Sequence, residues 1–357
     1  MTELHTVEPA YVPAGKLGFL FDYIITMKCN FSCTYCVIGR GGHDNKIPHP
    51  SRETCAKMLT QGFEYVSVVN KYKKERFKDC ILNLLGGEVL YHPDIENIIT
   101  DSTRIYEKYQ NDFNLKRRCT TNASAMPNKW KRLVKHIEEF TLSYHPESRD
   151  KFKEIFKINA HYLNEIGKKF DTISLMYSKA PYWEDALEFL EYGKKHNFNI
   201  RPRKVDGDIY SPEQIKILKE IGITIQHNQQ QGRACCGGRS MCTNRDLKTK
   251  HTFINRESEG FEGWHCSVPW FFLNANATSK EFNTNQDCRV RFDETRGPLA
   301  TIDTMDEYVE QVKEKFKNES MPLYKCVQKV CWCGTCAPKS KNLDTLKDIM
   351  KIYTTTH

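Results

Sequence analysis

The sequence lacks any apolar run that approaches the roughly 20 residues a membrane-spanning helix requires. Its first residues, MTELHTVEPAYVPAGK, lack the basic and then apolar layout of a secretory signal peptide. No repeat of fixed period and no low-complexity linker divides the chain. We therefore expect a cytoplasmic protein with no membrane partner, and 357 residues suggest about two domains.

The charge balance has only a modest excess of one sign. Lysine and arginine number 53 against 45 acidic residues, which gives a formal net charge of +8. The lysines alternate with acids in segments such as KYKKERFK, a pattern typical of solvated helix faces. A nucleic-acid-binding protein remains an alternative of a different class, but no RNP-type aromatic motif or helix-turn-helix supports it. The aromatic residues that could serve this nucleic-acid-binding alternative are Trp264, Trp270, Phe271 and Phe272.

The fifteen cysteines are too few for a small disulfide scaffold and are expected to be reduced, because no export signal is present. Thiols that lie close together are then better explained as metal ligands than as disulfides. Cys29, Cys33 and Cys36 form one group, and nine more cysteines lie between residues 235 and 336. Three isolated ones, which we expect to pack as small apolar side chains, are Cys55, Cys80 and Cys119.

The first part of the chain alternates short apolar segments with longer amphipathic ones. This alternation predicts an α/β fold with a parallel sheet, which we expect to be a partial TIM-like (β/α)6 barrel. Ser51 and Asp94 are candidate helix N-caps, and Gly167 suits a helix end. The expected strands are 17–26, 80–85, 115–121, 140–144, 172–177 and 199–205, and the expected helices are 52–72, 93–110, 128–139, 151–167 and 182–196.

The pattern changes after residue 205. A segment rich in turn residues leads to one more short helix, and from about residue 260 the sequence predicts a β-hairpin flanked by cysteines and then a helix near 303–318. We expect a small cysteine-rich α+β domain there, docked on the barrel. The predicted organisation is an N-terminal extension (1–16), the core barrel (17–205), a connecting segment (206–259) and the C-terminal domain (260–357).

The strongest chemical signal is the segment CNFSCTYC, residues 29–36, directly after the first predicted strand. Three thiolates at spacings of four and three residues, on a loop that leaves a strand, can bind three irons of one cubane iron-sulfur cluster and leave the fourth iron open. Structural zinc normally has four protein ligands, and no fourth cysteine or histidine is near enough in sequence to complete such a site.

This segment resembles the C-x3-C-x2-C loop of the radical S-adenosylmethionine (SAM) superfamily, including the aromatic residue before the last cysteine, here Tyr35. The resemblance covers about residues 17–205. It implies a 4Fe-4S cluster whose open iron binds the amino and carboxylate groups of SAM. It also implies reductive cleavage of SAM to methionine and a 5′-deoxyadenosyl radical.

A second motif, Gly86-Gly87-Glu88, follows the second predicted strand. By itself it would be only a turn. Glycines there allow close backbone approach to a ligand, and a carboxylate can bind an ammonium group. One strand after the cysteine loop, it resembles the family's GGE motif, which implies that it binds the amino group of SAM.

Polar residues also follow the later strands, where side chains of a barrel face its mouth. The resemblance implies that Asn122 and Ser143 contact the SAM ribose or carboxylate. Arg203, with Arg201 on the same strand, is a candidate for holding the SAM carboxylate, although a surface arginine pair is an equal alternative. His145 is a candidate acid or base toward substrate, or an ordinary loop histidine.

The C-terminal cysteines resemble the SPASM or twitch extension, which carries auxiliary iron-sulfur clusters. The twitch-like layout matches Cys266, Cys288, Cys333 and Cys336. A second auxiliary cluster would take its ligands from Cys235 or Cys236, Cys242, Cys326 and Cys331. The spacing of these last cysteines departs from the usual SPASM pattern, so one or two auxiliary clusters remain open. A zinc ribbon is the alternative for the same region.

Together these features predict a radical SAM enzyme, an oxidoreductase that abstracts a hydrogen atom from its substrate. The resemblance favours oxidation or crosslinking of a peptide or protein, with a small molecule or nucleoside as the second candidate substrate. It also implies a reducing partner such as flavodoxin or ferredoxin.

Overall fold

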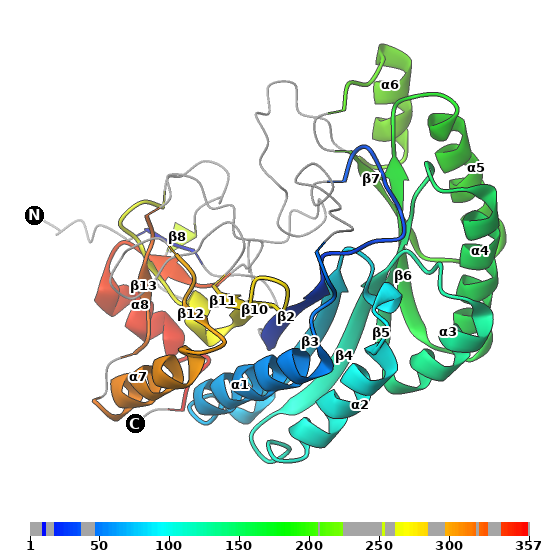
Figure 1. Ribbon diagram of the computed structural model, residues 1–357. Helices are drawn as coiled ribbons and strands as arrows, with labels where there is room; N and C mark the ends of the chain where they lie inside the picture. Colours follow the sequence, from blue (N-terminus) through cyan, green and yellow to red (C-terminus); the bar gives the residue numbers. More distant parts are fainter. Residues whose placement is uncertain are drawn as a thin grey trace, which may run out of the picture.

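The computed structural model describes residues 9–11, 18–36, 47–205, 208–223, 252–253, 261–284, 297–318, 321–327 and 337–355. Their main feature is a nine-stranded sheet with the order β12-β11-β10-β2-β3-β4-β5-β6-β7. A smaller sheet, with the order β13-β9-β14-β1-β8, is mostly antiparallel. Figure 1 shows the larger sheet as a curved layer with the helices along its outer side. The predicted α/β class is therefore confirmed.

Six neighbouring strands of the large sheet are parallel and follow one another in sequence. They are β2 (Phe19–Thr26), β3 (Asp79–Gly86), β4 (Asn114–Thr121), β5 (Glu139–Tyr144), β6 (Lys169–Met176) and β7 (Ile200–Lys204). The helices after them are α1 (Arg52–Asn70), α2 (Ile95–Tyr106), α3 (Pro127–Leu133), α4 (Asp150–Glu165), α5 (Tyr182–Lys195) and α6 (Pro212–Glu220). Because all six strands run the same way, their carboxyl ends meet at one edge of the sheet.

The alternation of buried residues shows which face of the sheet meets the helices. Phe19, Phe21 and Tyr23 of β2 are fully buried, and the Phe21 ring packs against Gly62 of α1 so closely that a Cβ there would lie 2.3 Å from it. Asp22 lies between these residues in sequence, so it is on the opposite face. In β2 the helix-covered face is thus apolar, and the opposite face carries Asp22, which is paired with Asn83 of β3.

The sequence located the strands and helices of this part well, with differences at the ends. Ser51 caps α1 as predicted, because its Oγ accepts a hydrogen bond from the Thr54 amide. The Asp94 side chain makes no such bond at the start of α2. Gly167 has φ +67°, the conformation expected after the end of α4. The helix expected over 128–139 is shorter, because α3 ends at Leu133 and a 3-10 turn follows.

The C-terminal region continues the large sheet. The predicted hairpin is present as β10 (Phe272–Asn276) and β11 (Glu281–Asn283), and β12 (Ala300–Thr301) pairs with β11. β10 pairs in parallel with β2, with Leu273 opposite Phe21, a pairing that was not expected from the sequence. The helices of this region are α7 (Met305–Lys317) and α8 (Leu343–Met350), of which only α7 was expected. Figure 1 shows this region beside β2.

The small sheet is built from short strands of both chain ends. These are β1 (Pro9–Tyr11), β8 (Thr252–Phe253), β9 (His265–Cys266), β13 (Tyr324–Lys325) and β14 (Lys339–Ser340). No helix in the described part of the chain is both long and apolar enough to cross a membrane.

The aromatic residues considered for a nucleic-acid-binding surface are core residues. Trp264, Trp270, Phe271 and Phe272 are each no more than 3% exposed. Buried rings cannot stack on bases, so these residues do not support the nucleic-acid alternative.

One core residue is a lysine. The Lys73 Nζ lies 5.1 Å from the ring centroid of Phe19 and 4.8 Å from that of Phe271, and the residue is 1% exposed. It has no hydrogen-bond partner among the described residues. Burial lowers the pKa of Lys73 from 10.5 to about 7, because the ammonium loses its hydration.

We expect Lys73→Met to stabilise the protein at pH 7 by an amount on the order of a few kcal/mol, since the buried charge is removed and the shape is kept. In the natural protein the folded state binds fewer protons than the unfolded state between pH 7 and 10.5, so stability rises with pH across that window and is flat below it. Urea unfolding of both proteins at pH 7 and pH 10 measures this. A difference between them that does not shrink at pH 10 would contradict the assignment.

Candidate functional site at the carboxyl ends of the parallel strands

The cysteine loop begins three residues after β2 ends, at the edge where the carboxyl ends of the parallel strands meet. Cys33 is 8% exposed, while Cys29 and Cys36 are partly buried, and all three belong to one apolar cluster. Within the loop the Cys36 amide donates to the Cys33 carbonyl, and the Phe31 amide lies 3.3 Å from the Cys29 sulfur. The three cysteines of this local turn therefore pack on the same small cluster of side chains.

The glycine motif after β3 supports the start of this loop. The Gly87 amide donates to the Thr26 carbonyl and the Glu88 amide donates to the Lys28 carbonyl, each at 2.8 Å. A Cβ on Gly87 would lie 2.4 Å from the Lys28 oxygen, and one on Gly86 would lie 2.6 Å from the Thr26 oxygen. Both glycines are thus required by close backbone contact with the chain that leads into the cysteines.

The Glu88 side chain is buried and has three hydrogen-bond donors within the protein. Its Oε1 accepts from the Leu90 amide (2.9 Å) and the Thr121 hydroxyl (2.7 Å), and its Oε2 accepts from the Asn122 amide (2.7 Å). Burial raises the pKa of Glu88, and these hydrogen bonds oppose that rise. The carboxylate therefore ties the end of β3 to the end of β4, and its predicted contact with the SAM amino group stays a prediction.

We expect Glu88→Gln to lower the free energy of unfolding by about 1 to 3 kcal/mol, because the new amide NH2 faces a buried donor that it cannot accept from. The control is Glu107→Gln, which changes an exposed residue at the end of α2 and should be nearly neutral. Urea unfolding of both variants gives the comparison. Unchanged stability with weaker SAM binding would instead mean that the carboxylate serves the ligand alone.

The end of β4 holds the first half of the loop. The Asn122 Nδ2 donates to the Asn30 Oδ1 at 3.0 Å, and the Asn30 Nδ2 donates to the Ser124 Oγ at 2.8 Å. The Asn122 Oδ1 accepts from the Ser124 amide. Both ends of the Asn122 side chain thus have partners in the protein, and its predicted contact with SAM remains a prediction.

The segment after β5 contacts the second half of the loop. The His145 ring is parallel to the Tyr35 ring, and its Nδ1 lies 3.1 Å from the Tyr35 hydroxyl and 3.5 Å from the Cys33 sulfur. Phe31 meets the same imidazole edge to face. Although His145 keeps some exposed surface, its ring lies among these side chains, and the lost hydration lowers the pKa of His145 to about 4. His145 therefore packs on the loop as a neutral imidazole.

Other predicted contact residues lie on the same sheet. Ser143 is partly exposed on β5, and Arg203 is exposed on β7. The Arg201 guanidinium forms an ion pair with Asp171 of β6. The structure thus places Arg201 and Arg203 on one strand, and their part in binding SAM is untested.

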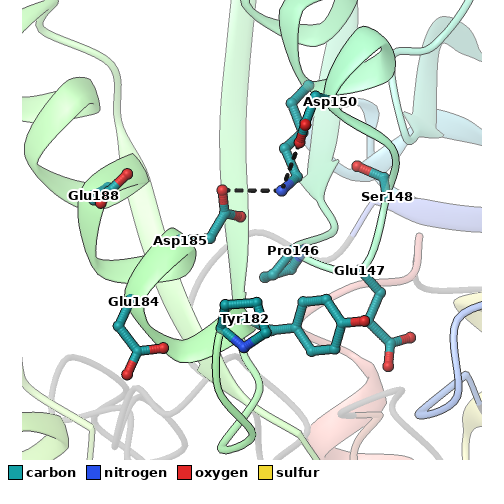
Figure 2. A pocket seen from close by; sticks show the side chains of 10 residues that line it. Pro146, Glu147, Ser148, Asp150, Tyr182, Glu184, Asp185 and Glu188 are labelled. Atoms are coloured by element: carbon teal, nitrogen blue, oxygen red, sulfur yellow. Dashed lines mark hydrogen bonds and ion pairs between the residues drawn. The ribbon is translucent and has the colours of Figure 1, made fainter.

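A cavity of about 480 Å³ opens beside this segment, between the starts of α4 and α5. Most of its charged residues are acidic, and Figure 2 shows Glu184, Asp185 and Glu188 on α5 facing the residues that lead into α4. Lys153 forms an ion pair with Asp185 at 3.0 Å. Glu147 also lines this cavity, while its carboxylate binds the cysteine loop.

Two of the predicted auxiliary ligands lie in the described part of the chain. Cys266 of β9 pairs with Tyr324 of β13, and the amide of Cys326, which directly follows β13, donates to the Trp264 carbonyl, so both cysteines lie in this part of the small sheet and both are buried. The sequence assigned them to different clusters. The other predicted ligands, which lie outside the described residues, are Cys235, Cys236, Cys242, Cys288, Cys331, Cys333 and Cys336.

The loop thiols fit an iron-sulfur cluster by their chemistry. Burial raises the pKa of Cys29 and of Cys33 to about 12, so both are protonated at neutral pH unless a bound cation stabilises the thiolate. Across the described residues, no three His, Cys, Asp or Glu side chains are grouped as ligands of one metal ion. A cubane has a different requirement, because each of the three thiolates binds its own iron.

Several residues of this site were not assigned by sequence. Asn30, Thr34 and Tyr177 have ordinary surroundings in the sequence, and their roles depend on contacts between segments far apart in the chain. Glu147 stands only two residues after His145, and that proximity was the one available signal.

The fold and the site together define an α/β protein with a three-cysteine loop at the carboxyl edge of a parallel sheet. No family model matches the chain, and no curated protein matches it. Two solved structures similar to it are native anSMEcpe with bound AdoMet and Cp18Cys peptide, and BtrN in complex with AdoMet and 2-DOIA. The first is 15% identical, covers 83% of this chain and 81% of its own, and has a TM-score of 0.49. The second is 12% identical, covers 85% and 91%, and has a TM-score of 0.34. At these values the similarity supports no conclusion about function. Such a conclusion must come from the residues of the site.

Proposed function

We propose that this chain is a radical SAM enzyme. The observation that carries the proposal is the packing of Cys29, Cys33 and Cys36 in one cluster directly after β2, on a loop that the ends of β3, β4 and β5 support. Cys29, Cys33 and Cys36 would hold a 4Fe-4S cluster with one open iron. Bound there, SAM would supply a 5′-deoxyadenosyl radical for hydrogen abstraction. The six parallel strands would form a partial barrel around the reacting groups.

The residues of this chain have separate tasks in the proposed reaction. Gly86, Gly87 and Glu88 keep the entry to the loop in place through backbone contacts. Tyr35 and His145 lie with parallel rings beside Cys33 and would line one side of the bound cluster. The candidates for SAM contacts are Tyr35, Glu88, Asn122, Ser143 and Arg203.

The side chains on the sheet face opposite the helices favour the hypothesis of a polar substrate. Asp22, Asn83, Arg118 and Glu139 are paired across β2 to β5 in one row. Asn83 donates to Asp22 at 2.8 Å, and Arg118 bonds Glu139 at 2.8 Å. A peptide or protein, with its many hydrogen-bonding groups, suits such a surface, and a polar small molecule or nucleoside is the second candidate. The proposed reactions are oxidation or crosslinking, with electrons from a partner such as flavodoxin or ferredoxin and with auxiliary clusters at the C-terminal cysteines.

Anaerobically reconstituted protein, incubated with SAM and dithionite, tests the proposal. We expect 5′-deoxyadenosine and methionine in equal amounts, measured by liquid chromatography. Protein that binds four or more irons but forms no 5′-deoxyadenosine would contradict it. Metal analysis of the same sample separates iron and sulfide from the zinc expected of a C-terminal zinc ribbon.

A further inference from the structure

The cysteine loop is held in two different ways. Its first half is held by neutral groups, through the amide and hydroxyl contacts of Asn30 with Asn122 and Ser124. In its second half, Thr34, the residue after Cys33, contacts the carboxylate of Glu147. The Glu147 Oε2 accepts from the Thr34 amide at 2.6 Å, and its Oε1 accepts from the Thr34 hydroxyl at 2.5 Å.

We propose that Glu147 is a positioning residue that fixes the Cys33–Cys36 part of the loop and places a negative charge beside the cluster bound there. The proposal rests on the function proposed above. Both oxygens of one carboxylate bind one residue, so Thr34 can neither rotate nor shift without losing a charge-assisted hydrogen bond. Thr34 lies between the proposed ligands Cys33 and Cys36 in sequence, so its position sets the path of the chain between them.

Neighbouring contacts make this attachment rigid. The Thr34 hydroxyl also lies 3.0 Å from the Tyr177 hydroxyl, and the Tyr177 ring packs on Tyr35 at 5.1 Å between centroids. His145, two residues before Glu147, stacks on the same Tyr35 ring. The segment after β5 thus contacts two successive residues of the loop, Thr34 and Tyr35, and the buried Pro146 connects the two contacting residues.

Glu147 differs from the other acidic residues nearby in its position relative to the cysteine loop. Figure 2 shows Glu147 on the opposite side of Tyr182 from Glu184. Among the acidic residues that line the cavity, Glu147 is the one that hydrogen-bonds to the loop within the described part of the chain. A negative charge beside a redox centre opposes the addition of an electron. Glu147 therefore lowers the reduction potential of a cluster held by the loop.

Glu147→Gln and Glu147→Ala separate the two parts of this inference, with Glu184→Gln as the matched control in the same cavity. Glutamine keeps one acceptor oxygen and removes the charge, so we expect near-normal iron content and a more positive midpoint potential. Alanine removes both acceptors, so we expect iron to be lost to a chelator about 10- to 100-fold faster, taking as a guide the loss of metal affinity when an outer-shell partner is removed. Glu184→Gln should change neither.

The readouts are a potentiometric titration followed by electron paramagnetic resonance and the rate of iron loss to bathophenanthroline. The signal of the loop cluster is assigned by its absence from the variant without the three loop cysteines, and circular dichroism checks that each variant is folded. If Glu147→Gln and Glu184→Gln have the same potential as the natural protein, the charge effect is refuted. If Glu147→Ala loses iron at the natural rate, the positioning role is refuted. Loop cysteines that bind no iron at all would refute the proposed function instead.

Discussion

Replacing Cys29, Cys33 and Cys36 together by alanine is expected to abolish the formation of 5′-deoxyadenosine from SAM. The three thiols are the proposed ligands in the described segment 29–36, and without them the irons of the loop cluster lose these three protein bonds. The iron content should fall by about four atoms per chain, one cubane. Iron bound by the C-terminal cysteines should remain. Chromatography of the products and metal analysis of the same protein give both numbers.

The control for this variant is Cys55→Ala. Cys55 is fully buried in α1 and belongs to the main core, apart from the cluster that holds the loop cysteines, so its loss should cost a little stability and no iron. Unchanged 5′-deoxyadenosine production by the triple variant would end the radical SAM proposal. Equal iron loss in both variants would mean that the protein is damaged in general.

The second large effect is expected of Gly87→Ala. The added Cβ would lie 2.4 Å from the Lys28 carbonyl oxygen and 2.6 Å from that of Met27, and backbone atoms cannot rotate away as a side chain can. The chain before Cys29 must therefore move. We expect the variant to lose about 1 to 3 kcal/mol of stability, or more, and to lose most of the iron bound by the loop. Urea unfolding and metal analysis measure the two effects.

Gly167→Ala separates this collision from the general effect of replacing a glycine. Gly167 has φ +67° and nothing within 4 Å of its Cβ position, so alanine costs backbone strain there without contacting the loop. We expect a loss of about 1 kcal/mol and normal iron content. If Gly87→Ala keeps its iron as well, the close backbone contact does not determine the position of the loop.

Sequence periodicity was sufficient for the six parallel strands, because each buried strand and each amphipathic helix has a local signature. It was not sufficient for the pairing of β10 with β2, because residues 250 positions apart leave no local pattern of their contact. The helix α8 was missed for a related reason. It is eight residues long, and its N-cap, Asn342, lies in a segment that reads as a turn.

In the candidate site, too, local patterns were predictable from the sequence and contacts between distant segments were not. The spacing of the cysteines and the glycines is local and was readable, whereas the three donors to the Glu88 carboxylate come from two separate strand ends. A motif predicts which residue types meet at a site. It does not predict whether a carboxylate is free for a ligand or already bound within the protein, and that depends on packing.

The parallel pairing of β10 with β2 has a consequence for how the chain acquires its structure. During synthesis, β2 is among the first strands to leave the ribosome, but its second neighbour, β10, is made about 250 residues later. Pairings between such distant segments raise contact order and slow folding. Until β10 arrives, one edge of β2 is open to pairing with other chains. A chain ended at residue 259 would keep that edge open permanently, so the six parallel strands with their helices should aggregate more readily than the whole chain.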